Sequence, residues 1–352
     1  MLEEMRVLDL SVWRPMPHAT QILADLGAEV LKVEPPGGDP MRGYPEIFAS
    51  VARGKRSIVL DLKTDAGRDR ALALAGAADV VCEGWRPGVA ARLGLDLNAV
   101  TAVNPTVIYC SVSGYGQDGP WRDVPGHDVN FQALAGALAT GGERSPDVPS
   151  LPVADLEAGT VAALVICAAW ARRLSTGLGE RIDVAMTDVV HWWVGTRSGT
   201  AHAEQVDRLG GSPGYGTFRA RDGRWLALGV LGEQRLWDAT CGALALTDLV
   251  GLAFVDRLTR TEEVNARIAE AIGRLDVNQA LATLLEHGAP VSPVLSPEEA
   301  SHHQQLDARG FHVETAAGPV AAFPARHGPA GARPDRIPAV GEHQEQPWST
   351  RA

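Results

Sequence analysis

The sequence predicts an α/β protein with a doubly wound, Rossmann-like large domain and a smaller α+β domain. In the first half of the chain, short apolar runs typical of strands alternate with longer helical segments, which indicates parallel βαβ units. From residue 210 the pattern changes to glycine-rich turns and alternating strands. With 352 residues, the chain also exceeds the usual size of a single core.

The elements of the large domain follow from these runs in order. A first strand over 6–10 precedes a helix in which Ile22, Leu23 and Leu26 repeat at helical spacing and Gly27 is a natural C-cap. A second helix is expected over 65–78, in "DAGRDRALALAGAA". The remaining strands are expected at 30–33, 57–62, 79–83 and 107–112.

The predicted domain organisation has four parts. Residues 1–190 form the large domain, 191–214 a linker and 215–300 the small α+β domain. Residues 301–352 return to complete the large domain. The tail from 316 is rich in Ala, Pro, Gly and Arg, so we expect an extended segment lying over another surface.

Composition excludes several classes of function. Apolar residues make up 45% and charged residues 21%, which is globular, and the net charge of −11 argues against nucleic acid or an anionic membrane as partner. The apolar run 161–171 is shorter than the roughly 20 residues of a membrane span, and we expect a buried helix. The start resembles no signal peptide, and four widely spaced cysteines suggest neither zinc nor disulfides. A cytoplasmic protein is expected.

Several motif matches do not indicate a functional site. "GYGQDG" at 114–119 satisfies the dinucleotide fingerprint, but Pro120 follows where a helix is needed. The chain has no G-x-S-x-G elbow. Cys110 near a strand end is more typical of a buried cysteine than of a nucleophile. His302 and His303 are adjacent, so they point in different directions on a helix and favour a solvated face over a metal site.

The stretch "DVPGHDVNFQALAGAL" (123–138) has a more consistent context. Gly126 permits a turn, and His127 and Asp128 then begin a helix whose free N–H groups give positive character. Asp155 stands where the long apolar helix starts. Each carboxylate is also explained as a helix cap, and His127 as a hydrogen-bonded structural histidine.

Eight pieces of the chain, in order, carry a specific resemblance. They are "LADLGAEVLKVEPPGGDP" (23–40), "RGKRSIVLDLK" (53–63), "RPGVAARLGL" (86–95), "IYCSVSGYGQDGP" (108–120), "PGHDVNFQALAG" (125–136), Asp155, "GERIDVAM" (179–186) and "PVSPVLSPEEASHH" (290–303). Together they resemble the family that contains the family III CoA-transferases and α-methylacyl-CoA racemase. The resemblance implies an interlocked homodimer whose large domain binds CoA.

The resemblance also implies a role for basic residues early in the chain. All three lysines, Lys32, Lys55 and Lys63, lie in its first fifth, where we look for phosphate binding. Positions that match the family make Leu62, Lys63, Arg86 and Arg92 the CoA candidates. A solvated basic face is the alternative, and it is preferred for Arg53, Lys55 and Arg56.

Two chemistries share this family. In the racemases, residues matching His127 and Asp155 are the two bases that exchange the proton α to the thioester. In the transferases, the aspartate matching Asp155 forms a mixed anhydride and then an aspartyl-CoA thioester. "GHD" and "GGSPGYGTFRARDG" (210–223) favour a racemase of 2-methyl-branched acyl-CoA thioesters, with CoA-transferase as the alternative and a non-catalytic acyl-CoA binder as a third hypothesis.

One position departs from the racemase pattern. The family glutamate after the strand in "WLALGV" falls on Gly232, with Glu233 one residue later, and such a shift is absorbed in a loop but not in a strand. Glu233 is therefore a third catalytic candidate. No metal or cofactor is expected, since the CoA thioester is the substrate. Trp192 and Trp193 either line the acyl pocket or belong to the core or dimer interface.

Overall fold

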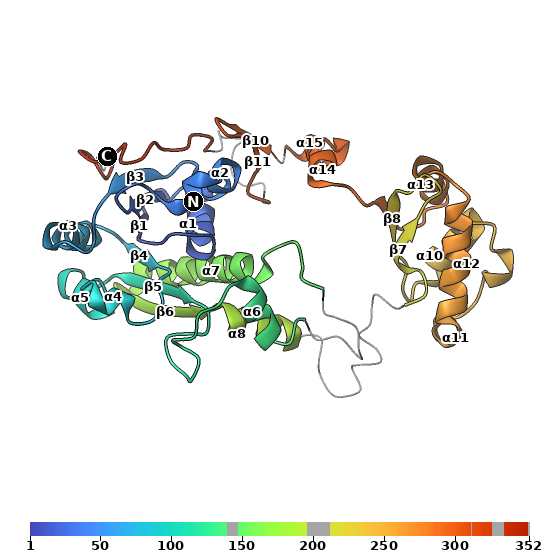
Figure 1. Cartoon of the computed structure of the whole chain (residues 1–352), viewed down its shortest axis with the longest axis horizontal. Coiled ribbons are helices and arrows are strands. Elements are labelled where there is room, and N and C mark those ends of the chain that lie inside the picture. The colour runs from blue at the N-terminus through green and yellow to red at the C-terminus, as the bar shows by residue number, and fades with distance from the viewer. Residues whose placement is uncertain (139–146, 196–211, 311, 326–333, 351–352) are drawn as a thin grey trace. The chain divides into compact units, whose positions relative to one another are not determined.

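A computed structural model of the chain describes residues 1–138, 147–195, 212–310, 312–325 and 334–350 (Figure 1). It divides into two compact units, Met1–Thr196 with Asp307–Ala352, and Arg197–Leu306. The expected linker at 191–214 falls largely on 196–211, outside the described residues.

The first unit contains a six-stranded parallel sheet in the order β3-β2-β1-β4-β5-β6. This is the strand order of a doubly wound Rossmann sheet, which confirms the predicted α/β class. The sixth strand was not predicted, because Arg181 and Asp183 alternate with its buried residues and obscure the apolar run. The strands are β1 (Arg6–Asp9), β2 (Glu29–Glu34), β3 (Arg56–Val59), β4 (Val80–Glu83), β5 (Ile108–Ser113) and β6 (Glu180–Ala185).

Helices cover both faces of this sheet, because successive strand residues point to opposite sides. Val7 packs in a core with α1 (Pro15–Asp25), α7 (Val153–Thr176) and α8 (Met186–Gly195). Leu8, the next residue, packs in a second core with α3 (Asp65–Gly76) and α5 (Leu97–Val103). Shorter helices of this unit are η1 (Pro40–Gly43), α2 (Pro45–Ala52), α4 (Val89–Arg92) and α6 (Asp128–Leu134). Helix α14 (Pro297–Ser301) belongs to the second unit, and α15 (Gln304–Arg309) includes residues of both.

Helix α7 is longer and less buried than the sequence predicted. It runs for 24 residues and, by length and composition alone, is the one described helix that could cross a membrane. Its small residues form the buried face, and a side chain at Gly159 would lie 2.5 Å from the carbonyl oxygen of Pro15. On the opposite face, Leu164 and Val165 are exposed. The expected buried helix is therefore buried on one side only.

The C-terminal part differs in one respect from the unpatterned tail expected from residue 316. Strands β10 (His312–Thr315) and β11 (Gly318–Ala321) form an antiparallel hairpin, and Val313 and Val320 pack against α2. Beyond it the extended return is present. Residues 334–350 run beside β3, where the Ser57 carbonyl accepts the His343 N–H at 2.8 Å and the Gln344 side chain accepts the Val59 N–H at 2.9 Å.

The second unit is a small α+β arrangement, as predicted from the change of pattern at residue 210. A three-stranded antiparallel sheet packs with helices around the buried Trp237. The Arg257 guanidinium is buried against the Trp237 ring and donates to the Leu231 carbonyl at 3.0 Å. Its elements are β7 (Tyr215–Arg219), β8 (Trp225–Gly229), α10 (Gln234–Ala243), η3 (Thr247–Leu249), α11 (Phe254–Thr259), α12 (Thr261–Gly273), α13 (Val277–Glu286) and β9 (Val291–Pro293).

Candidate active site

A cavity of about 620 Å³ opens in the first unit at the carboxyl ends of β1, β4 and β5. Trp13 follows β1, Arg86 follows β4, and Gly114 follows β5, and all three line the cavity. The connections reverse direction between β1 and β4, and such a switch point is where doubly wound sheets bind ligands. The fold alone therefore favours this cavity as the functional site.

His127 and Asp155 both line this cavity. His127 is the residue before α6, and the Asn130 side chain accepts its backbone N–H at 3.0 Å. Asp155 is the third residue of α7 and not its cap, since the helix begins at Val153 after Pro152. Two residues that lie 28 positions apart in the sequence are thus brought to one site by the starts of two helices.

Asp128 holds these two helix starts together. Its Oδ1 accepts the backbone N–H of Asp155 at 3.1 Å, and Gln132 donates to the other carboxylate oxygen. We expected Asp128 to cap its own helix, but it is the first residue of α6 and caps α7 instead. Pro152 has no side-chain acceptor to offer α7, which explains why the cap comes from another helix.

The electrostatic setting of Asp155 follows from this arrangement. Burial and the negative charge of Asp128 raise the pKa of Asp155 to about 6, while the positive charge of Arg14 and the His127 ring oppose the rise. Both the carboxylate and the carboxylic acid are therefore populated near neutral pH, as acid–base catalysis requires.

Gly126 has a different role from the one predicted. We expected a turn glycine, but the backbone there needs no left-handed conformation. A side chain at Gly126 would instead lie 2.7 Å from the Phe131 ring, and one at Gly114 would lie 2.5 Å from it. Tyr115 meets the same ring edge to face at 5.1 Å. The two glycines let the loop before His127 pack closely on α6.

The CoA candidates follow the carboxyl ends of β3 and β4 in the chain. Lys63 follows β3, Arg86 follows β4 and lines the cavity, and Arg92 ends α4. All three side chains are exposed, and within the described ranges none of them makes a hydrogen bond or ion pair. Leu62 is half-buried against the core formed with α3 and α5. These three charged side chains are therefore available to bind an anion.

Comparison with known proteins decides the family. Residues 2–344 match the profile of CoA-transferase family III. The chain belongs to this family. It is 33% identical to an acetyl-CoA:oxalate CoA-transferase of Acetobacter aceti over 88% of this chain and 84% of that protein. It is 31% identical to human alpha-methylacyl-CoA racemase over 98% and 92%.

A solved structure has the same fold over nearly all of this family III chain. The crystal structure of a CaiB/BaiF family protein from Brucella suis superposes with a TM-score of 0.86 at 27% identity and covers 97% of this chain and 96% of its own. Other curated relatives of similar identity are also named as CoA-transferases.

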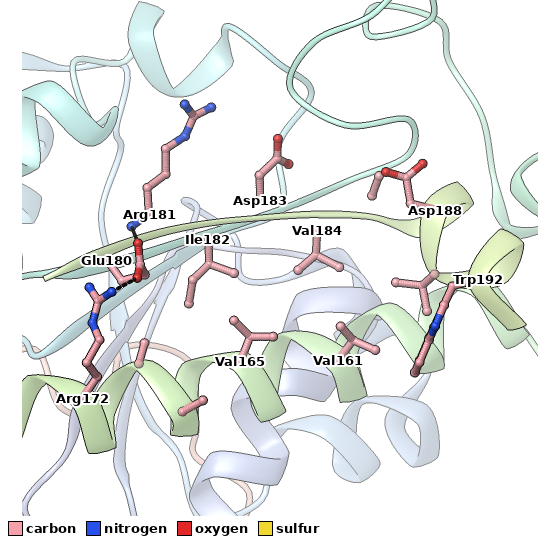
Figure 2. A pocket seen from close by; sticks show the side chains of 14 residues that line it. Val161, Val165, Arg172, Glu180, Arg181, Ile182, Asp183, Val184, Asp188 and Trp192 are labelled. Carbon is pink, nitrogen blue, oxygen red and sulfur yellow. Dashed lines mark hydrogen bonds and ion pairs between the residues drawn. The ribbon is translucent and has the colours of Figure 1, made fainter.

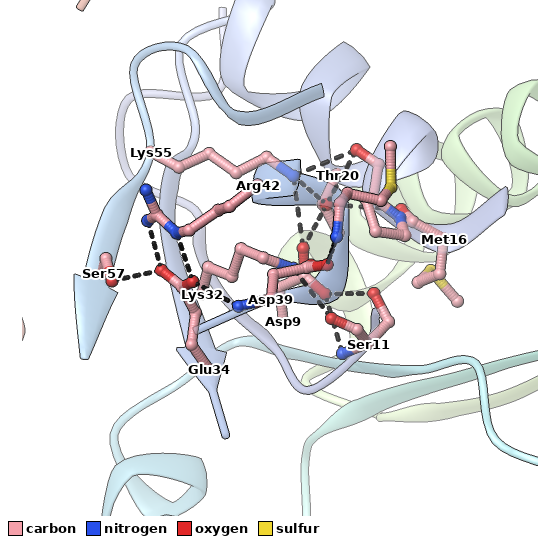
Figure 3. A network of polar contacts seen from close by, with 12 residues as sticks. Asp9, Ser11, Met16, Thr20, Lys32, Glu34, Asp39, Arg42, Lys55 and Ser57 are labelled. Atoms are coloured by element: carbon pink, nitrogen blue, oxygen red, sulfur yellow. Dashed lines mark hydrogen bonds and ion pairs between the residues drawn. The ribbon is translucent and has the colours of Figure 1, made fainter. Parts of the chain in front are cut away.

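Lys32, Arg53 and Lys55, also early in this family III chain, are buried and form no solvated face. Lys55 pairs with Asp9 at 3.2 Å and Lys32 with Asp39 at 2.7 Å, all within one buried network (Figure 3). Arg53 is also buried and pairs with Asp25. The solvated face preferred for Arg53 and Lys55 was therefore wrong, and Lys32 is not available for phosphate, because a buried carboxylate already neutralises each of these three cations.

Glu233 lies in the loop after β8, where it precedes α10 and is exposed. The one-residue shift from the family position thus falls in a loop and leaves strand pairing unaffected. Glu233 belongs to the second unit, and its catalytic role stays a prediction.

Cys110 and the His302–His303 pair lie outside the site, whereas Gly114 and Tyr115 of "GYGQDG" line the cavity. "GYGQDG" leads into turns, Cys110 is fully buried, and burial raises the pKa of its thiol. His302 and His303 belong to no cluster that could hold a metal among the described residues. Trp192 lines a second, shallower cavity between α7 and β6, where Val161 and Val165 face Ile182 and Val184 (Figure 2). Trp192 and Trp193 do not line the cavity that His127 and Asp155 share.

Proposed function

We propose that this family III member is an acyl-CoA racemase or epimerase that inverts the α-carbon of 2-methyl-branched acyl-CoA thioesters. One observation carries the proposal: His127 and Asp155 line a single cavity, with their helix starts joined by Asp128. Racemisation by 1,1-proton transfer needs two such groups, because the α-proton leaves one face of a planar enolate and returns to the other.

The proton balance uses both side chains. Neutral His127 takes the α-proton of one enantiomer and becomes an imidazolium, and protonated Asp155 delivers its proton to the opposite face of the enolate. The reverse reaction starts from the imidazolium and the carboxylate. The raised pKa of Asp155 keeps its acid form available near neutral pH. Glu233 is proposed as a third, accessory catalytic group.

CoA binding is proposed for Leu62, Lys63, Arg86 and Arg92. The 3′-phosphate and pyrophosphate of CoA are anions for which lysine and arginine are suitable donors. The unpaired state of the three cationic side chains supports this role. The thioester itself is the substrate, so the proposed reaction uses no metal or further cofactor.

CoA transfer is the second candidate, and the names of several relatives favour it. In this reaction the Asp155 carboxylate attacks the thioester carbonyl and releases CoA thiolate, leaving a mixed anhydride. The thiolate then attacks the Asp155 acyl carbon, which releases the donor acid and forms an aspartyl-CoA thioester. An acceptor carboxylate reverses these steps and leaves with CoA.

An interlocked homodimer is also proposed. Exposed Leu164, Val165 and Trp192 form an apolar face over α7 and α8, in keeping with a covered surface. Sedimentation on dilution tests it, because interlocked chains leave no compact monomer, whereas reversible dissociation into compact monomers contradicts it.

Deuterium incorporation from solvent tests the reaction. A racemase labels the α-carbon of a 2-methylacyl-CoA without any acceptor acid. A transferase gives a new thioester only when an acceptor carboxylate is present, and hydroxylamine displaces CoA from its aspartyl-CoA thioester to leave a hydroxamate on Asp155. A protein that binds the thioester and does neither would overturn both proposals.

A further inference from the structure

Arg14 is a cation in the catalytic cavity that the proposed reaction does not use. It directly precedes α1 and is half-buried among the residues that line the cavity. Across the described part of the chain, no hydrogen bond or ion pair holds its guanidinium. Arginine stays charged at every physiological pH and carries five N–H donors, so a partly buried one needs an acceptor.

The backbone places Arg14 next to Asp155. Gly159 is four residues after Asp155 and so lies on the same face of α7. That face contacts the chain beside Arg14, since a side chain at Gly159 would come within 2.5 Å of the Pro15 carbonyl oxygen. Trp13 adopts a left-handed conformation, with φ of 67°, although half of its surface is exposed. Such strain in a bulky residue is typical of functional sites.

The cavity has an excess of positive charge in a protein whose net charge is −11. Arg14, Arg86 and Arg122 line it, and Asp155 is the one carboxylate among the described residues that line it. Arg122 lies 3.6 Å from Asp123, and Arg86 is assigned to CoA. Arg14 is the cation that remains without an assigned anion.

We propose that Arg14 binds a carboxylate at the far end of the acyl group, so that the substrates are CoA thioesters of dicarboxylic acids. The proposal rests on the proposed acyl-CoA chemistry at Asp155 and narrows its substrate class. A cation beside the reacting carboxylate lies at the thioester end of CoA, which the whole pantetheine arm separates from the nucleotide phosphates. The guanidinium fork matches a carboxylate with two parallel hydrogen bonds.

Two pairs of probes that differ by one group test the proposal. For binding, S-(3-carboxypropyl)-CoA is compared with S-butyl-CoA by calorimetry, because neither thioether reacts. For turnover, 2-methylsuccinyl-CoA is compared with 2-methylbutanoyl-CoA. We expect the unmodified protein to prefer the carboxylate of each pair at least tenfold, and Arg14→Gln to remove most of that preference by weakening the carboxylate probe alone. Arg14→Lys should retain part of it, since the charge stays and the fork is lost.

The binding pair separates failure of this inference from failure of the proposed reaction. If the thioethers show the Arg14-dependent preference and no ester turns over, the inference stands and the reaction falls. Equal affinity of the unmodified protein for both thioethers overturns the inference. So does an equal loss of turnover for both esters in Arg14→Gln, which would indicate stabilisation of the enolate. Arg70→Gln, an exposed arginine on α3, is the matched control and should keep the preference, and unchanged melting temperatures show that the variants fold.

Discussion

The carboxylate of Asp128 accepts the backbone N–H of Asp155 at 3.1 Å, so the residue after His127 fixes the first turn of the helix that carries the second catalytic candidate. One side chain thereby sets both the position of Asp155 and part of its electrostatic environment. This relationship allows the two effects to be separated by substitution.

Asp128→Asn should lower the pKa of Asp155 from about 6 towards its ordinary value, because the negative neighbour is removed while an amide oxygen still accepts the N–H. The measurement is the pH dependence of deuterium exchange in the direction in which Asp155 is the base. Its acid limb should move to lower pH. Asp118→Asn, an exposed carboxylate before α6, should leave the limb in place, and an unmoved limb in Asp128→Asn would contradict the assignment.

Loss of the helix cap should lower the free energy of unfolding. Asp128→Ala removes both the charge and the acceptor, so it should destabilise the protein by about 0.5–2 kcal/mol relative to Asp128→Asn. Urea unfolding of the two variants provides the comparison.

His127→Ala and Asp155→Asn should each abolish net racemisation but retain exchange at one enantiomer. Each variant keeps one of two opposite bases, so the retained enantiomer should differ between them. Chiral analysis of deuterium in the α-position gives the result. Transfer chemistry predicts another pattern, in which Asp155→Asn loses all activity and His127→Ala is only slower.

Lys63→Ala and Arg92→Ala should raise KM for every CoA ester at least tenfold and leave kcat close to its original value. Each change removes one charge-assisted phosphate contact, worth about 1.5–3 kcal/mol. Esters of 3′-dephospho-CoA should be affected less. Arg309→Ala, at an exposed position on α15, serves as the control. Calorimetric affinities that stay unchanged in both variants would place the CoA site elsewhere.

Asp9→Asn should destabilise the first unit by about 3–5 kcal/mol, because the buried Lys55 ammonium loses its carboxylate. Burial opposes ionisation of Asp9, but Lys55, Lys32 and two hydroxyl groups outweigh it and lower the pKa of Asp9 to about 2. Since this pKa is below the unfolded value, the contribution is present above pH ~4 and is lost as the pH falls towards 2.

The urea midpoint as a function of pH checks this prediction. Asp65→Asn breaks an exposed pair with Arg68 and should change the midpoint little. A midpoint in Asp9→Asn equal to that of Asp65→Asn would contradict the role of the buried pair.

Much of the sheet could be predicted because its inner strands are buried on both faces and read as continuous apolar runs. β6 escaped prediction because an edge strand exposes alternate residues. The buried Lys55 and Lys32 escaped it as well, since sequence shows a charge but not the partner that folding brings to it. His127 was predicted from the resemblance of "PGHDVNFQALAG" to the family, and Asp155 was predicted from the same resemblance.

Asp128 was visible in the sequence but its role was not. A carboxylate at a helix start is expected to cap that helix, and its bond to a residue 27 positions later depends on how two helices meet. The role of Arg14 could not be predicted from the sequence either. Only the structure shows that this arginine lines a cavity and that its guanidinium lacks an acceptor among the described residues.

The segment 334–350 beside β3 has a consequence for how the chain is made. During synthesis, β1 to β6 leave the ribosome well before the residues that cover the open edge of β3, because the whole second unit is translated in between. An unpaired edge strand is a template for pairing with other chains. The nascent protein therefore passes through a long interval in which its main sheet can form while one edge is unprotected, and chaperone binding during translation should concentrate on β3.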